Sequence, residues 1–332
     1  MSIPEYPPLS FSYSQLQMLT LCKRRWWWRY QGHWKGWLNS APVATQNAYR
    51  ISKLEPLSSW AGKRTHDGIS RYLSGVPIDS VLTGLREKLA YEFKLSSRIP
   101  AGSFGSPKEF RLEEHYFGRH VSPERFQEVV HEVCENLISY DKFCLDNFCS
   151  KNFRYDFRAL IKEARDNKRF HHLDGPSISF EDRGLKSSKI GDGAIVFYAA
   201  PDFAIDLGNG TLLIIDWKTG RARQNAGSDA TQQLKSYALF VCLKYPKLFE
   251  SIQYFDLYEF YMPNCTFAGD KFAKIDVNST LRKIASDANT IIQLQDGQRM
   301  VQKSSCPPSP ESERCSRCPF IELCPDGRSV CG

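Results

Sequence analysis

Residues 201–218 read PDFAIDLGNGTLLIIDWK, and this stretch decides the fold class. Two runs rich in Ile, Leu and Phe flank Gly208-Asn209-Gly210, which is a strong signal for the turn of a β-hairpin. We therefore expect strands over 194–207 and 211–217. The apolar spacing further along the chain predicts a helix over 229–244, a strand over 252–262 and a helix over 278–294. This order predicts an α/β fold with a mixed central sheet flanked by helices.

The sequence before residue 175 is predominantly helical. Ser12 and Gln15 have the spacing of a capping box and predict a helix that continues to Tyr30. Helical periodicity also covers residues 60–73, 78–97, 122–146 and 155–166. The tail over 304–332 is rich in Cys, Pro and Ser and lacks apolar periodicity, so we expect it to fold only if something ties it down.

The composition bounds the class of protein. Among the 332 residues, 42% are hydrophobic and 24% are charged, which excludes a collagen, a long disordered chain and a coiled-coil rod. No apolar run approaches the roughly 20 residues of a membrane helix, and the first residues do not resemble a signal peptide, so we expect a cytoplasmic protein without membrane contact. A formal charge of +7 mildly favours a polyanionic partner.

Charged residues end the second predicted strand. Asp216 and Lys218 are two positions apart, so on a strand they share one face. The preceding strand offers Asp202 and Asp206 on one face, and the hairpin can bring one of them beside Asp216. Two carboxylates with waters suit Mg²⁺ or Mn²⁺ and phosphodiester hydrolysis. The alternative is a solvated salt bridge between Asp216 and Lys218.

Two other helices carry polar side chains that can join this group. Gln233 and Tyr237 are four residues apart and share one face of the helix that follows the strand. His66 follows Gly62 by four residues in a predicted helix, where a histidine alone is more often structural than a metal ligand.

Together these motifs, Gly62 to His66, Pro201-Asp202, Asp216-Trp217-Lys218 and Gln233 to Ala238, resemble the RecB-like branch of the PD-(D/E)XK nucleases. The resemblance implies a restriction-endonuclease-like core and a Mg²⁺ or Mn²⁺ site. It also implies the site residues, with His66, Asp202 and Asp216 as metal ligands, Asp202, Asp216 and Lys218 as catalytic residues, and Gln233 and Tyr237 lining the site. Many relatives have glutamate where this chain has Asp216.

The chain has 11 cysteines, and three of them form a cluster in the tail. Cys315, Cys318 and Cys324 have the spacing C-x₂-C-x₅-C, which suits zinc or an iron–sulfur centre that needs about four ligands. The candidates for the fourth ligand are Cys306, Cys331 and Cys22.

The resemblance selects among these candidates. Iron–sulfur members of the branch, such as AddB-type recombination nucleases and CRISPR adaptation exonucleases, place one cysteine in an N-terminal helix and three beyond the core. It thus implies a [4Fe–4S] cluster on Cys22, Cys315, Cys318 and Cys324, with Zn²⁺ as the alternative. The expected unit over 1–332 then comprises an N-terminal cluster-linked segment at 1–60, a helical insertion at 75–175, a catalytic core at 190–265 and the cysteine-rich tail at 304–332, which forms a cluster lobe.

Basic and aromatic residues follow Cys22. Arg24, Arg25, Trp27 and Arg29 combine cations for phosphates with a ring on which unpaired bases stack, so we expect them to bind single-stranded DNA. The alternative is that the tryptophans pack the cluster lobe.

The expected function is a metal-dependent DNA nuclease, an exonuclease acting on single-stranded ends. The sequence contains no G-x-x-x-x-G-K-[ST] phosphate loop and so no recognisable NTP-driven motor. We therefore expect that a helicase partner would have to open a duplex before it is cleaved. A CRISPR adaptation or defence-system protein is another expected partner. The alternative function is a non-catalytic nucleic-acid-binding subunit of a helicase–nuclease or defence complex.

Overall fold

The computed structural model describes residues 5–7, 9–104, 110–145, 155–166, 196–199, 201–221 and 228–331. Part of the insertion predicted at 75–175 and the start of the strand predicted at 194–207 lie outside the described residues.

Four strands form the central sheet in the order β3-β4-β5-β6. Their bounds are Phe203–Asp206 for β3, Thr211–Lys218 for β4, Tyr254–Tyr261 for β5 and Thr266–Ala273 for β6. β4 and β5 run parallel, whereas β3 and β6 are antiparallel to their neighbours. A parallel pair needs a crossover, which α9 (Ser228–Lys244) and α10 (Pro246–Ser251) provide. The predicted mixed sheet is confirmed. A separate short pair, β1 (Ser10–Phe11) and β2 (Val196–Phe197), is parallel.

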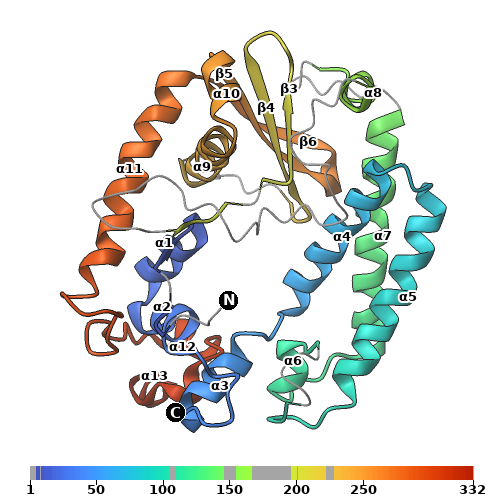
Figure 1. The fold of residues 1–332 in the computed structure, drawn as a ribbon. Coiled ribbons are helices and arrows are strands. Elements are labelled where there is room, and N and C mark those ends of the chain that lie inside the picture. Colours follow the sequence, from blue (N-terminus) through green and yellow to red (C-terminus); the bar gives the residue numbers. More distant parts are fainter. Residues whose placement is uncertain are drawn as a thin grey trace.

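Helices cover both faces of the sheet (Figure 1). One face packs on α4 (Leu57–Leu73), α5 (Ile78–Ser97) and α7 (Pro123–Leu145), and the other on α9 and α11 (Lys274–Gln293). Along β4, Leu213 and Ile215 enter the first core, while Leu212 and Ile214 enter the second. Burial on both faces explains why this strand is a continuous apolar run rather than an alternating one.

Most predicted helices are present with small shifts at their ends. The periodicity over 78–97, 122–146 and 155–166 corresponds to α5, α7 and α8 (Phe157–Asp166). The predicted N-terminal helix is split, because Cys22 is extended with φ −162 and ψ 110 between α1 (Tyr13–Leu21) and α2 (Lys23–Tyr30). Ser12 caps α1 by accepting a hydrogen bond from the Gln15 amide at 3.2 Å.

One strand was missed from the sequence. β6 is an edge strand whose side chains are mostly exposed, so it lacks the apolar alternation that identifies a strand. Gly269 in its middle has φ +157, and a Cβ there would lie 2.0 Å from the Leu257 carbonyl oxygen. Only glycine permits this close pairing with β5.

The tail folds against the N-terminal helices. It contains α12 (Ser312–Ser316), the 3₁₀ turn η2 (Ile321–Leu323) and α13 (Pro325–Ser329), and it lies beside α2 and α3 (Val43–Ile51) in Figure 1. Arg314 donates to the Leu21 carbonyl at 2.8 Å, and Phe320 is buried with Trp28 in a small third core. Segments almost 300 residues apart in sequence therefore support one another.

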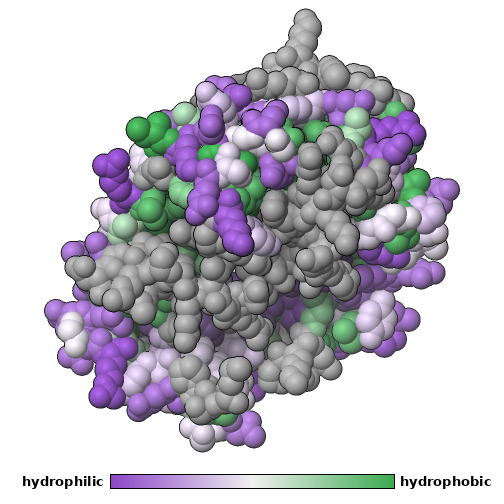
Figure 2. All heavy atoms as spheres, turned by 45° about the horizontal axis from the view of Figure 1, so that its top comes forward, coloured by the Kyte–Doolittle hydropathy of each residue, from purple (hydrophilic) through white to green (hydrophobic). Residues whose placement is uncertain are grey.

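On the face shown in Figure 2, hydrophilic side chains predominate among the coloured atoms and hydrophobic ones form small separate patches. Within the described ranges, no helix is both long and apolar enough to cross a membrane.

Candidate active site and cysteine pocket

A group of charged side chains gathers where β3 begins and β4 ends. Asp202 directly precedes β3, and its Oδ2 accepts a hydrogen bond from the Trp217 amide of β4 at 2.8 Å. His66 of α4 lies with Nδ1 3.0 Å from Asp202 Oδ1. α4 approaches the strand closely here, since a Cβ on Gly62 would lie 3.3 Å from Thr219 Oγ1.

The two carboxylates of the group, a buried Asp216 and a half-buried Asp202, shift one another's pKa. Burial and then the Asp202 charge raise the pKa of Asp216 to about 7. Burial also opposes ionisation of Asp202, but His66 and the Trp217 amide outweigh it and lower the pKa of Asp202. Asp202 in turn raises the pKa of His66 against the effect of burial. Asp202 therefore ionises more readily than a free aspartate, whereas Asp216 ionises less readily.

Lys218 forms ion pairs with two carboxylates. Its Nζ contacts Asp216 Oδ2 and lies 3.3 Å from Oε1 of Glu259, on β5. Glu259 Oε2 accepts a hydrogen bond from the Tyr261 hydroxyl at 2.6 Å. Glu259 was not predicted from the sequence. The available signal was the pair of acidic residues, Asp256 and Glu259, inside an otherwise apolar and aromatic strand, and this signal does not say which of the two lies at the site.

α9 brings Gln233 and Tyr237 to the same place. Gln233 Nε2 donates to the Tyr237 hydroxyl oxygen at 2.6 Å. Burial, and then the charges of Asp216 and Asp202, raise the pKa of Tyr237 well above its usual value. The tyrosine therefore lies close to the carboxylates and stays a neutral phenol.

Asp206 lies apart from this group. It pairs in register with Leu212 at the turn end of the hairpin, and its Oδ1 accepts from the Gly208 amide at 2.8 Å. Of the two aspartates that share this strand face, Asp202 is the one beside Asp216.

The donor set fits a hard divalent cation. In the described part of the chain, no three His, Cys, Asp or Glu residues are grouped closely enough to hold a metal ion by themselves. Mg²⁺ does not require this, because it keeps several waters and binds through one or two carboxylates together with phosphate oxygens. Asp202 and Asp216 provide such carboxylates. Their coupling, in which one charge raises the pKa of the other group, is the repulsion that a cation would relieve.

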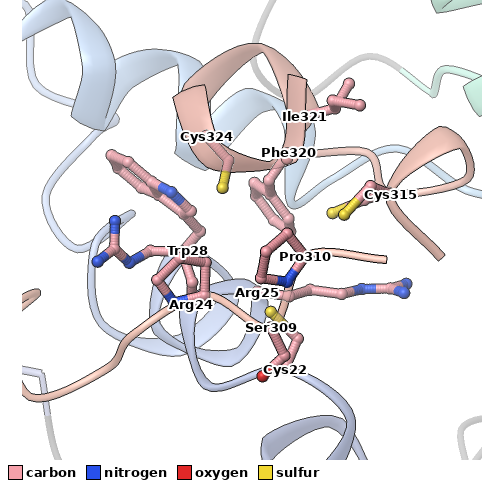
Figure 3. A pocket seen from close by; sticks show the side chains of 13 residues that line it. Cys22, Arg24, Arg25, Trp28, Ser309, Pro310, Cys315, Phe320, Ile321 and Cys324 are labelled. Atoms are coloured by element: carbon pink, nitrogen blue, oxygen red, sulfur yellow. The ribbon is translucent and has the colours of Figure 1, made fainter. Parts of the chain in front are cut away.

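Four cysteines line one pocket between the N-terminal helices and the tail. They are Cys22, Cys315, Cys318 and Cys324, and none is in a disulfide. In Figure 3 the sulfurs of Cys22, Cys315 and Cys324 point toward one shared space.

Gly327 leaves room beside two of these sulfurs. A Cβ there would lie 3.4 Å from Cys324 Sγ and 3.5 Å from Cys315 Sγ. Of the alternatives for the fourth ligand, Cys306 is buried in the core and Cys331 is exposed with Sγ near the Ser312 carbonyl; neither is among the described residues that line the pocket. The structure therefore brings the four predicted cysteines to one pocket, and their role as ligands stays a prediction.

The predicted DNA-binding run makes contacts within the protein. Arg24 donates to the Cys306 carbonyl and Trp27 to the Val301 carbonyl, both at 2.8 Å, while Arg29 donates to the Ser52 carbonyl. Arg25 lines the cysteine pocket. These contacts favour the alternative in which the segment packs the N-terminal helices on the tail. A role in DNA binding stays a prediction.

Two comparisons with known proteins give different results. No curated protein matches the chain, whereas a family model does. The family model of the PD-(D/E)XK nuclease superfamily matches residues 10–325, a range that contains both the carboxylate group and the four pocket cysteines. The chain therefore belongs to the PD-(D/E)XK nuclease superfamily.

Proposed function

We propose that this protein is a metal-dependent deoxyribonuclease that degrades single-stranded DNA from its ends and carries a structural [4Fe–4S] cluster. Membership in the superfamily implies the nuclease activity and its dependence on Mg²⁺ or Mn²⁺. The observation that carries the proposal is the convergence of Asp202, Asp216 and Lys218 beside His66.

Each side chain has a role in hydrolysis. Asp202 and Asp216, with His66, would hold the cation, which polarises the phosphoryl group and activates water. His66 and the Trp217 amide fix both oxygens of Asp202. Lys218 places a positive charge next to the reacting phosphate, where it stabilises developing negative charge.

α9 closes the site from one side of the sheet. Tyr237 stays protonated beside the carboxylates and Gln233 fixes its hydroxyl, so the pair offers a neutral polar wall to the substrate.

The proposed preference for single strands is supported by the absence of an NTP-binding phosphate loop in the sequence, and the preference for ends is the part that the comparison of linear with circular strands tests. Without a motor, the enzyme acts on strands that are already open or are opened by a helicase partner. A CRISPR adaptation or defence-system protein would place the same reaction in another process, and co-purifying proteins would distinguish these partners.

A non-catalytic nucleic-acid-binding subunit is the alternative function. In such a protein nothing requires a complete set of two acids, a lysine and a histidine in contact. The completeness of the set favours catalysis.

Cleavage assays test the proposal. Linear single strands, circular single strands and linear duplex of one sequence are incubated with Mg²⁺ or Mn²⁺, and linear single strands are expected to be degraded fastest. Asp216→Asn is expected to remove cleavage, while Asp206→Asn, in the same hairpin, is expected to retain it. Equal cutting of circles would instead indicate an endonuclease, and unchanged cleavage by Asp216→Asn would contradict the site.

The cluster proposal rests on the chemistry of the cysteine pocket. Cys22, Cys315, Cys318 and Cys324 line one pocket, which supports a centre that needs about four thiolate ligands. The resemblance to the iron–sulfur members of the RecB-like branch favours a four-iron cluster over a zinc ion. The cluster would tie the tail to the N-terminal helices.

A further inference from the structure

Glu259 is an acidic residue in the site that the motif pattern does not include. β5 pairs in parallel with β4, and in this register Asp216 lies opposite Glu259 and Lys218 opposite Tyr261. Because side chains alternate along a strand, all four face the side of the sheet covered by α9. Their neighbours Trp217 and Phe260 face the opposite core.

Both oxygens of Glu259 are engaged. Oε1 lies 3.3 Å from Lys218 Nζ, and Oε2 accepts the Tyr261 hydroxyl at 2.6 Å. The residue is only 5% exposed. A buried carboxylate is costly unless it is paired and hydrogen-bonded, so these two contacts are what make a charged side chain tolerable at this position.

Lys218 has two carboxylate partners, and one of them is also a candidate cation ligand. Once Asp216 directs its oxygens at a cation, its attraction for the ammonium weakens, because the cation repels Lys218 and competes for the same oxygens. Glu259 is then the carboxylate that remains on Lys218.

We infer that Glu259 is a positioning residue, which holds the Lys218 ammonium in place while Asp216 serves the cation, and that Tyr261 fixes the orientation of Glu259. The inference rests on the proposed nuclease function. Glu259 acts through Lys218 and is not itself a metal ligand.

The first experiment measures steady-state cleavage and Mn²⁺ binding for Glu259→Gln. Loss of a supporting partner is expected to lower kcat by about 10- to 100-fold, while KM and the Mn²⁺ dissociation constant stay close to those of the parent. Tyr261→Phe is expected to lower kcat in the same direction by less. A parent-like kcat for Glu259→Gln overturns the inference, and so does a loss of Mn²⁺ affinity as large as the loss of kcat.

Asp256→Asn is the matched control. Asp256 is a buried acid on the same strand, but it accepts a hydrogen bond from Tyr155 on the opposite face of the sheet. Its removal is expected to reduce stability and to leave kcat unchanged. A similar fall in kcat for Asp256→Asn would show that any buried acid of β5 has the same structural effect, which overturns the inference.

A double-mutant cycle separates positioning from general damage. In a Lys218→Met background, Glu259→Gln is expected to cause no further loss of residual cleavage, whereas a structural role would cause the same loss again. Thermal unfolding of the metal-free protein gives a second cycle, in which the two substitutions are expected to be non-additive. Additive effects in both cycles overturn the inference. Failure of the proposed function has a different signature, because the parent then shows no metal-dependent cleavage although the unfolding cycle still reports the contact.

Discussion

Replacing Asp216 by Asn tests the electrostatics of the site in the metal-free protein. Burial and the Asp202 charge raise the pKa of Asp216 to about 7, whereas an unfolded aspartate titrates at about 4. Between these two values the folded protein keeps a proton that the unfolded chain has lost. The free energy of unfolding therefore falls as the pH rises from about 4 to about 7, and the loss is complete above the folded pKa.

The size of this effect follows from the two pKa values. A difference of about three units is worth about 4 kcal/mol. Asp202, whose pKa is lowered, is ionised in both the folded and the unfolded state across this window, so it does not change the slope of stability against pH. Asn has the shape of the neutral carboxyl group and cannot ionise. Metal-free Asp216→Asn is therefore expected to be more stable than the parent at pH 8, with a Tm higher by about 2 to 6 °C.

The assay is thermal unfolding in a chelator between pH 5 and pH 8. The Tm of the parent is expected to fall with rising pH, that of Asp216→Asn to fall less, and that of Asp206→Asn to follow the parent. Mn²⁺ added at pH 8 is expected to raise the Tm of the parent and not that of Asp216→Asn. Parallel curves of Tm against pH for the parent and Asp216→Asn would refute the reasoning.

Three further predictions concern Lys218 and the cysteine pocket. Lys218→Ala is expected to lower kcat more than Mn²⁺ affinity, because an ammonium is not a ligand; an equal loss in both, measured by kinetics and calorimetry, would contradict this. Anaerobically purified protein is expected to be brown with about four irons per chain. Cys22→Ser is expected to lose the iron and Cys331→Ser to keep it, and metal analysis that finds zinc without iron would refute the cluster. Gly327→Val is expected to lower the iron content, since a Cβ at Gly327 already lies 3.4 Å from Cys324 Sγ, whereas Gly327→Ala is expected to retain more iron.

Local pattern was sufficient to predict the elements whose burial is regular. α5 and α7 present apolar residues at helical spacing, and β4 is a continuous apolar run because both of its faces are buried. The break at Cys22 has no comparable signal. Contacts distant in sequence accompany it, including the hydrogen bonds from Arg314 to Leu21 and from Arg24 to Cys306.

The candidate site likewise has one part that the sequence pattern predicts and another part that it does not. Alternation along one hairpin is enough to put Asp216 and Lys218 on one face, and a tight turn limits which acid of the first strand lies beside them. Glu259 required more than this. Its place opposite Asp216 depends on the parallel register of β4 and β5, which is set by a helical crossover and its packing rather than by a turn.

Packing connects the cysteine pocket to the nuclease site. Trp26, four residues beyond Cys22, is 1% exposed and belongs to the same core as Leu234 and Ala238 of α9. Those residues lie beside Gln233 and Tyr237, which wall the site. Because a protein interior is close-packed, we expect a shift of α2 to be felt by α9 through this shared core. We therefore expect the proposed cluster to support the candidate nuclease site through this core, by fixing α2, and to take no part in phosphodiester chemistry.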